Sequence, residues 1–482
     1  MKNTLKRTLT GLIVASMILG VACKKNGDSS NPGPGLGTGA PPVTNDEHQG
    51  VKDRAAELAE EQAAALPDVT VTKKIELMSW FDLDETSPTV ELFKARYGTP
   101  DEAGGKNVIN LTRVSYDDRY EALDRAIMGD KSPDMFQFEE RYFPWGVHIN
   151  YFETIDGVID LSGPEWDATR DYIKLFEWGG KNYTPITEIN NSNSLLFYRN
   201  TIIAEQGFED PYELWKKDEW DWDVFEDMVR QFSDPTNNKY GIMGFGIDEA
   251  AILTTGIGII TIEDSKLKNN MFDAKIERAT DLLKRLSDGN YRYPYHTLSD
   301  FQLNPAAFRA GEVLFWQDGP WVYQERIKNW IEPDKWEDGG DEIGIVPFPR
   351  DPMADKYYQR GKQDAMMLVA GSKNKDGYIA WNHCAAIANN DTKMDAEGRD
   401  KLKKDYNWTE HQLTVLDEIR NMELVWDFKN GIGPDVSDYR ESPIEDLTKP
   451  LITHGEVTYA QQRSENQSKI ETRIDMMNEK VS

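Results

Sequence analysis

The stretch AAFRAGEVLFWQDGPWVYQERIKNWIEPDKWEDGGDEIGIVPFP, residues 306–349, decides the fold, because its pattern predicts helix, strand, helix and strand in succession. Asn304 and Pro305 suit the cap and the first turn of a short helix that ends at Gly311. Residues 313–317 form an apolar run with the length and composition typical of a buried strand. A buried strand framed by two helices is therefore predicted at the centre of this segment.

The turn after this strand carries side chains suited to binding a ligand. Asp318-Gly319-Pro320 offers a side-chain oxygen and a ring with a preset φ, so we expect a helix that is capped at Asp318 and has Trp321 in its first turn. The free N–H groups of that helix start, with Trp316 close by in the strand, place donors, an acceptor and flat apolar faces within one turn. Trp316, Asp318 and Trp321 are therefore candidate ligand-binding residues.

A series of motifs along the chain resembles one known family. The series comprises the short helix ending in Gly, the apolar strand, the Gly-Pro-Trp turn, Ile345-Val346-Pro347-Phe348-Pro349, Ser132-Pro133-Asp134, LLFYRN at 195–200, and Asp221-Trp222-Asp223. In this order the motifs resemble the extracellular solute-binding proteins of bacterial ABC importers, the maltose-binding-like group, from about Val69 to the C-terminus. The resemblance implies an α/β fold with two lobes joined by hinge crossings, of the periplasmic-binding-protein type II kind, and a receptor that delivers its solute to permease subunits.

The N-terminal residues 1–22 have the pattern of a secretory signal peptide. Lys2, Lys6 and Arg7 precede an apolar run that ends at Ala22 and is shorter than the roughly 20 residues a membrane-spanning helix needs. Leu19-Gly20-Val21-Ala22-Cys23 resembles a lipobox, with Gly20 where Leu is usual. We therefore expect lipidation of Cys23 and attachment to the cell surface or the periplasmic face. The alternative is an ordinary secretory signal followed by a free cysteine.

Residues 23–66 are predicted to form a tether followed by a short helix. From Lys24 to about Gln49 the chain is rich in Gly, Pro, Ser, Asn and Asp and has almost nothing apolar to bury. Residues 51–66 are rich in Ala and Glu, which favours a helix. The only cysteine besides Cys23 is Cys384, so no disulfide framework exists, and we expect Cys384 to be a small buried hydrophobe in a helix at 376–388.

Net charge and length exclude several classes of partner. The formal net charge is −29, and removal of the signal peptide with its three positive charges takes it to −32. Such a surface repels phosphate backbones and anionic headgroups, so we expect no nucleic-acid partner and no membrane contact besides the lipid anchor. The 416 residues from Pro67 onward exceed what one core normally serves, so we expect two lobes, in a monomer.

The first part of the body alternates strands and helices. Strands are predicted at 69–80, 108–114 and 135–138, with helices that Ser87 and Asp117 cap. This alternation predicts an α/β lobe with an open sheet. Ligands of such sheets bind beyond the carboxyl ends of the strands, which makes candidates of the residues after the first and third strands: Trp80, Phe81, Glu139 and Glu140.

The family resemblance divides the body at three crossings, in residues 183–200, at 361–369 and near Gly431-Ile432-Gly433-Pro434. We therefore expect lobe 1 to comprise residues 67–183 and 363–430, and lobe 2 to comprise residues 184–362 and 431–482. Lys362, Gln363 and Asp364 lie at the second crossing, where they either contact ligand or bond to hinge backbone. Further helices are predicted at 222–232, at 274–287 with Asp273 as cap, after a Thr409–Gln412 capping box, and at 459–478.

The candidate residues have the chemistry that a carbohydrate requires. The C–H faces of a sugar ring pack on an indole, and its hydroxyl groups donate hydrogen bonds to carboxylates. Trp321 beside Asp318 and Glu139 would therefore bind a sugar. Competing interpretations stay open. Trp316 and Trp80 suit a core position equally well, and Glu139 with Glu140 also suits a solvated pair at a strand end.

Signatures of enzymes and cofactors are missing from the sequence. The six His are scattered without a His-Glu-x-x-His motif, two cysteines cannot form a zinc cluster, and Asp82-x-Asp84 lacks the rest of a calcium loop. We therefore predict a receptor, not an enzyme, that uses no cofactor or metal, captures a carbohydrate between its lobes and delivers it to an ABC permease. The alternatives are a surface polysaccharide hydrolase, which needs two suitably spaced carboxylates, and a receptor for peptides or another polar solute.

Overall fold

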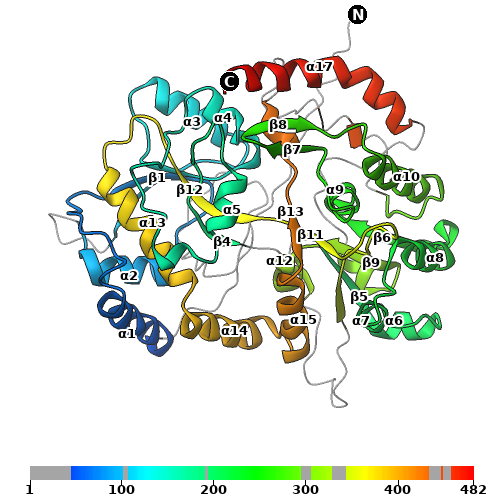
Figure 1. Cartoon of the computed structure of the whole chain (residues 1–482). Coiled ribbons are helices and arrows are strands. Elements are labelled where there is room, and N and C mark those ends of the chain that lie inside the picture. Colours follow the sequence, from blue (N-terminus) through cyan, green and yellow to red (C-terminus); the bar gives the residue numbers. More distant parts are fainter. Residues whose placement is uncertain are drawn as a thin grey trace, which may run out of the picture.

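The computed structural model describes residues 45–100, 107–189, 194–294, 305–327, 343–433, 444, 447–448 and 457–481. Two sheets form its frame, one of five strands in the order β2-β1-β3-β12-β4 and one of four strands in the order β10-β5-β9-β6 (Figure 1). Each sheet is flanked by helices, so the predicted two-lobed α/β fold is confirmed.

The first three strands of the first sheet run parallel to one another. Strand β1 (Ile75–Ser79) pairs in parallel with β2 (Ile109–Arg113) and with β3 (Met135–Gln137). Strand β12 (Gln363–Leu368) runs antiparallel to β3 and to β4 (Ile186–Ile189). The carboxyl ends of β1, β3 and β4 therefore meet the start of β12 at one edge of the sheet.

Helices α2 (Pro88–Tyr97), α13 (Lys375–Asn389) and α3 (Arg119–Met128) are among those that cover the first sheet. Helix α2 begins where the Ser87 side chain accepts a hydrogen bond from the backbone N–H of Val90, which confirms Ser87 as its cap. Helix α13 packs against α2 and buries Cys384 completely. Helix α3 starts later than predicted: Asp118 stands at its N-cap and makes no capping bond, so Asp117 is not the cap.

The second sheet contains the stretch 306–349 from which the fold was predicted. Helix α11 (Pro305–Arg309), strand β9 (Val313–Asp318), the short helix α12 (Pro320–Val322) and strand β10 (Ile343–Pro347) follow in the predicted order. Strand β9 lies between β5 (Leu195–Arg199) and β6 (Tyr240–Gly244) and has every residue buried. The apolar run at 313–317 is a central strand because both of its faces are covered.

Helices that cover the second lobe also begin at local capping signals. Asp221 accepts from two backbone N–H groups at the start of α8 (Trp222–Phe232), and Asp273 caps α10 (Ala274–Asp288) as predicted. Other elements of the described residues are α4 (Trp145–His148), α5 (Arg170–Leu175), α6 (Asn200–Glu205), α7 (Pro211–Lys216), α9 (Ile247–Leu253), β7 (Ile260–Glu263), β8 (Lys266–Asn269) and α14 (Thr392–Tyr406), with short 3-10 and π turns between some of them.

Short strands connect the two sheets. Strand β11 (Tyr358–Arg360) leads directly into β12 and pairs in parallel with β13 (Glu423–Val425), and Figure 1 shows both between the sheets. Strand β13 therefore lies beside the second crossing. The third crossing near Gly431 stays a prediction, and Pro434 lies outside the described residues. Two connecting strands that pair side by side form a narrow joint between the lobes.

The helices after the second crossing divide differently from the prediction. Helix α15 (Glu410–Arg420) has the predicted Thr409–Gln412 capping box, and the Gln412 amide donates to the Ile343 carbonyl of β10 at 2.8 Å. This helix packs on the second sheet, although residues 363–430 were expected in lobe 1. The C-terminal helix α17 (Tyr459–Glu479) contacts β8 and α10, and its Arg473 also lies over the Trp145 ring of the first lobe. The assignment of residues 431–482 to lobe 2 stays a prediction.

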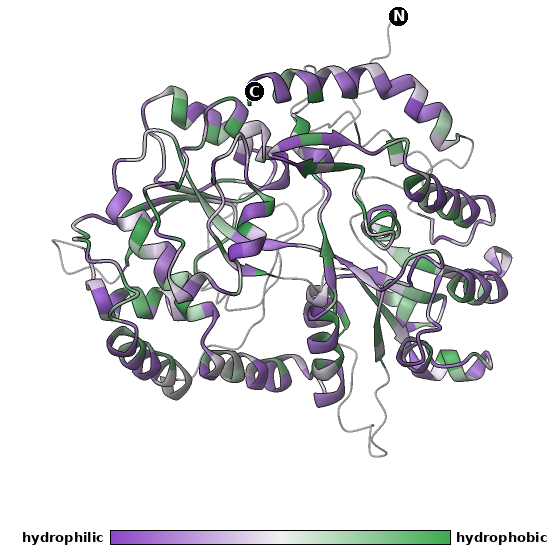
Figure 2. Cartoon of the chain, viewed as in Figure 1, coloured by the Kyte–Doolittle hydropathy of each residue, from purple (hydrophilic) through white to green (hydrophobic). Residues whose placement is uncertain are grey.

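The first described helix, α1 (Asn45–Glu61), fastens the N-terminal segment to the body. Figure 2 shows hydrophobic and hydrophilic residues interspersed along the helices, as expected for helices that bury one face. Ala55 and Leu58 are buried against α2, and Arg54 pairs with Asp391 at 2.7 Å. The helix begins within the predicted tether, whereas the predicted signal peptide and Cys23 lie outside the described residues. Within the described part of the chain, no helix has the length and apolar character to cross a membrane.

Candidate functional site

Seven of the candidate residues converge on one edge of the first sheet. Trp80 and Phe81 directly follow β1, and Glu139 and Glu140 follow β3. The Phe138 N–H donates to the Ala365 carbonyl at 2.8 Å, which brings the start of β12, with Lys362, Gln363 and Asp364, alongside. The sheet topology is the reason for this convergence, because parallel strand ends meet the start of an antiparallel neighbour there.

Trp80 and Glu139 both contact Arg119, a residue that the sequence analysis did not select. The Arg119 guanidinium carbon lies 5.1 Å from the centre of the Trp80 ring, and Nη2 lies 3.1 Å from Glu139 Oε2. Trp80 is half-buried, and its ring meets that of Phe81 at 5.5 Å, edge to face. Trp80 and Glu139 thus remain partly accessible to solvent at the strand ends, and both contact the Arg119 guanidinium.

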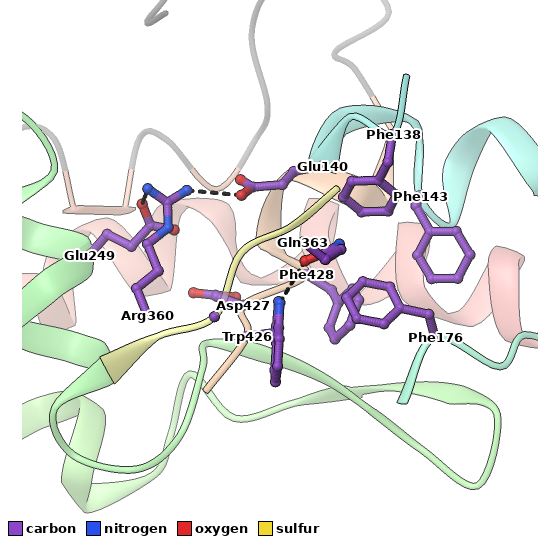
Figure 3. A pocket seen from close by; sticks show the side chains of 11 residues that line it. Phe138, Glu140, Phe143, Phe176, Glu249, Arg360, Gln363, Trp426, Asp427 and Phe428 are labelled. Atoms are coloured by element: carbon purple, nitrogen blue, oxygen red, sulfur yellow. Dashed lines mark hydrogen bonds and ion pairs between the residues drawn. The ribbon is translucent and has the colours of Figure 1, made fainter. Parts of the chain in front are cut away.

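An ion pair network joins the two lobes beside this edge. Arg360, at the end of β11, lies 2.8 Å from Glu140 in the first lobe and 3.2 Å from Glu249 in helix α9 of the second (Figure 3). The Arg360 side chain is 11% exposed, so its charge is largely removed from water. The two carboxylates therefore supply the stabilisation that water would otherwise give to this charge. A residue of the joint therefore bridges the lobes.

Burial and the surrounding charges act differently on the ionisable groups of this network. Burial alone would raise the pKa of Glu140, but Arg360 and Lys362 hold that pKa below its usual value. At Glu249 burial prevails over the attraction of Arg360 and Lys429, so its pKa is raised. Burial, together with the neighbouring Arg360 charge, lowers the pKa of Lys362. Glu140 is therefore ionised at neutral pH and pairs with Arg360 as a carboxylate.

A small pocket opens at the same joint. Its lining combines charged groups with an aromatic wall: Phe138, Glu140, Phe143, Phe176, Glu249, Arg360, Gly361, Gln363, Trp426, Asp427 and Phe428 (Figure 3). The Trp426 indole N–H donates to Gln363 Oε1 at 2.8 Å and fixes that amide. A side chain at Gly361 would place Cβ 2.2 Å from the Trp426 ring, so glycine is needed for this close approach. Flat apolar faces beside fixed polar groups are typical of small-molecule sites.

The second-lobe candidates lie around the Gly-Pro-Trp turn. Asp318 is 6% exposed, and its Oδ1 accepts from the Gly319 N–H at 2.9 Å. The N-cap of α12 is Gly319, which has no side chain to form a capping bond. The prediction that Asp318 caps this helix is therefore wrong. Among the described residues Asp318 Oδ2 has no hydrogen-bond partner, and burial raises the pKa of the carboxyl to about 8. Trp321, in the first turn, is half-buried against the second-lobe core.

Trp316 is a core residue and does not belong with these candidates. Its side chain is fully buried in β9, and its ring meets that of Phe308 at 5.5 Å, edge to face. Phe197 and Met243 are its register partners on the two neighbouring strands. Of the two interpretations open for Trp316, the structure therefore supports the core position, because β9 is covered on both faces.

Sequence reasoning missed Arg119, Glu249, Arg360 and Trp426. Arg119 stands between tyrosines in the segment YDDRY, and Arg360 stands two residues before Lys362 at the crossing, which are weak local signals. Glu249 and Trp426 enter the site only because distant segments meet at the joint. Their roles follow from the fold and could not be predicted from neighbouring residues.

Comparison with known proteins agrees with this architecture. The family described as bacterial extracellular solute-binding proteins matches residues 93–396, more than half of the chain. No curated protein sequence matches the chain.

Solved structures share its fold at low sequence identity. The ABC substrate-binding protein Lmo0181 from Listeria monocytogenes, in complex with cycloalternan, is 14% identical with a TM-score of 0.58, over 84% of this chain and 98% of that one. An ABC transporter solute-binding protein from Thermotoga lettingae, bound with α-D-tagatose, is 15% identical with a TM-score of 0.55, over 83% and 100%. The sugar-binding protein MalE from Xanthomonas citri is 14% identical with a TM-score of 0.55, over 84% and 98%. With two lobes, a joint of paired crossing strands and a family match over most of both lobes, the chain belongs to the bacterial extracellular solute-binding proteins, which are receptors of ABC transporters rather than enzymes.

Proposed function

We propose that this receptor captures a carbohydrate between its lobes and delivers it to an ABC permease. The observation that carries the proposal is the placement of Trp80 and Glu139 at the sheet edge beside the interlobe pocket. Ligand contacts are proposed for Trp80, Phe81, Glu139, Glu140, Lys362, Gln363 and Asp364 from this edge, and for Asp318 and Trp321 from the second lobe.

The chemistry of these side chains favours a neutral polyol. Indole and phenyl rings pack on the C–H faces of a sugar, and each carboxylate accepts hydrogen bonds from hydroxyl groups. The strongly negative chain, with a net charge of −29, disfavours an anionic solute. The sugars bound by the Listeria and Thermotoga proteins support a saccharide as the first ligand class to test.

Capture requires a ligand that contacts both lobes only when they close on it. Such a ligand has a higher affinity for the closed state and therefore shifts the hinge equilibrium towards that state. The crossing strands β11 and β13 are the joint about which we propose this motion. The proposed lobes are residues 67–183 with 363–430 and residues 184–362 with 431–482, apart from α15, which packs on the second sheet.

Anchoring at the cell surface or the periplasmic face by a lipid on Cys23 is part of the proposal. Its support is the signal-like segment at residues 1–22 and the tether sequence that follows Cys23. A tethered monomeric receptor would remain near its permease and still be free to reorient.

Isothermal titration calorimetry with a ligand panel tests the ligand class. The panel contains maltotetraose, cycloalternan, tagatose and a mixture of short neutral peptides, each titrated into the mature chain. We expect one saccharide to bind with a stoichiometry near one and to be recovered intact. Binding of the peptides alone would contradict the carbohydrate assignment, and appearance of shorter sugars would favour the polysaccharide hydrolase instead.

A further inference from the structure

Arg119 lies in a cage of aromatic rings at the first-lobe edge of the site. The guanidinium carbon is 3.5 Å from the centre of the Tyr116 ring, 4.1 Å from that of Tyr120 and 5.1 Å from that of Trp80. Arg119 is 4% exposed, so its charge depends on these rings and on its hydrogen bonds for stabilisation.

The same guanidinium organises the Glu139 carboxylate. Nη2 bonds to the Tyr120 hydroxyl at 2.8 Å and to Glu139 Oε2 at 3.1 Å, and Nη1 donates to the Tyr116 carbonyl. The Tyr120 hydroxyl donates to the same Glu139 Oε2 at 2.8 Å. Two donors hold the Oε2 oxygen in place, and the Glu139 side chain remains 17% exposed.

We propose that Arg119 is the positioning residue of the first-lobe half of the ligand site, because one guanidinium holds the Trp80 ring and the Glu139 carboxylate in a fixed mutual arrangement. This inference rests on the proposed function, since it assigns to Arg119 an effect on two proposed ligand contacts. Arg119 itself is too buried to reach a solute. It acts through the ring and the carboxylate that stay accessible.

Preorganisation is the physical basis of this role. A free Trp side chain and a free Glu side chain each lose rotamer freedom when a ligand orders them, and that loss weakens binding. Side chains that the protein has already ordered avoid the loss. Arginine suits the task better than lysine, because its planar group stacks on rings and forms several bonds in fixed directions.

Fluorine NMR of the mature chain labelled with 5-fluorotryptophan tests the arrangement without any ligand. Trp80→Phe identifies the Trp80 resonance among those of the 14 tryptophans. We expect Arg119→Met to shift or broaden that resonance while most others stay in place, and Arg119→Lys to restore it only in part. Arg125→Met is the matched control, because Arg125 lies on the same helix with its side chain 67% exposed. An unchanged Trp80 resonance in folded Arg119→Met would overturn the inference.

A mutant cycle tests the consequence for binding, with maltotetraose and cycloalternan as probes. We expect Arg119→Met to weaken saccharide binding about tenfold, and to weaken it far less in a Glu139→Gln, Trp80→Phe background, because Arg119 then has little left to position. Equal losses in both backgrounds would overturn the role. Tyr120→Phe removes the Tyr120 bonds to Glu139 and to Arg119 but keeps the guanidinium, so it gives a smaller loss and serves if Arg119→Met fails to fold.

The two hypotheses fail in different ways. If neither saccharide binds the wild-type chain, the carbohydrate assignment fails, while the fluorine spectrum still decides whether Arg119 holds Trp80. If a saccharide binds and Arg119→Met binds it equally well, the assignment stands and the positioning role is refuted.

Discussion

Arg360 Nη2 lies 2.8 Å from Glu140 Oε1, so the strand that connects the lobes is tied to the end of β3 by an ion pair between residues 220 positions apart. The other side of the same guanidinium reaches Glu249 in the second lobe at 3.2 Å. Because one cation serves both lobes, the relative placement of the lobes depends on this network.

We predict that Glu249→Gln loosens the joint, because it removes the charge that ties Arg360 to the second lobe. The spread of interlobe distances is measured between spin labels on Met128→Cys in the first lobe and Asp281→Cys in the second, both exposed positions. Cys23→Ser removes the other reactive thiol, and Cys384 is buried. The distance distribution should broaden. Glu226→Gln, which breaks a pair with Arg285 inside the second lobe, is the control and should leave it unchanged.

Asp318 predicts a pH dependence of stability. Burial raises the pKa of this carboxyl to about 8 from its usual value of 3.8, so between these values the folded state holds a proton that the unfolded state has lost. That contribution to stability is present at low pH and is lost as pH rises towards 8.

The measurement is urea unfolding at pH 5 and pH 8 for wild type and Asp318→Asn. The Asn oxygen can still accept from the Gly319 N–H, so the fold is kept. We expect wild type to lose at least about 2 kcal/mol more than the variant across this range. Equal losses would show that Asp318 titrates normally in the folded state.

Truncation of Trp316 should mainly reduce stability, whereas truncation of Trp321 should mainly reduce saccharide binding. Trp316→Ala removes a fully buried ring from the second-lobe core and should cost about 3–5 kcal/mol of unfolding free energy. Trp321→Ala should cost much less stability and weaken saccharide binding by about tenfold or more. Urea unfolding and calorimetry on both variants distinguish these roles, and a stable Trp316→Ala that fails to bind would contradict the core assignment.

Cys23→Ser should release the protein from the membrane. Without the thiol no lipid can be attached, and the charged chain has little affinity for anionic headgroups. Detergent-phase partition of the wild-type and variant proteins made in a lipoprotein-processing host is the measurement. Equal partition of both into the aqueous phase would indicate an ordinary secretory signal.

The features that the sequence predicted correctly depend on local chemistry or on a general rule of topology. Ser87, Asp273 and the Thr409–Gln412 pair cap the helices that follow them, since such bonds span only a few residues. Trp80 and Glu139 meet at a sheet edge because the carboxyl ends of parallel strands lie together.

Other features depend on contacts between distant segments and were not predictable. The pairing of Arg360 with Glu140, and the packing of α15 on β10, require the folded arrangement of both lobes. Trp316 and Trp321 are five positions apart in similar surroundings, and only the coverage of β9 on both faces separates a core ring from a candidate ligand contact. Asp318 is not the cap because it is the last residue of β9, so that Gly319 stands at the N-cap of α12.

Capture between two lobes is tested most directly by calorimetry of one saccharide, the best binder of the panel, against wild type, Trp80→Ala and Trp321→Ala. We predict one bound saccharide per wild-type chain and a loss of about tenfold or more in affinity when either lobe loses its indole. Absence of binding to wild type, or a loss confined to one of the two variants, would contradict it.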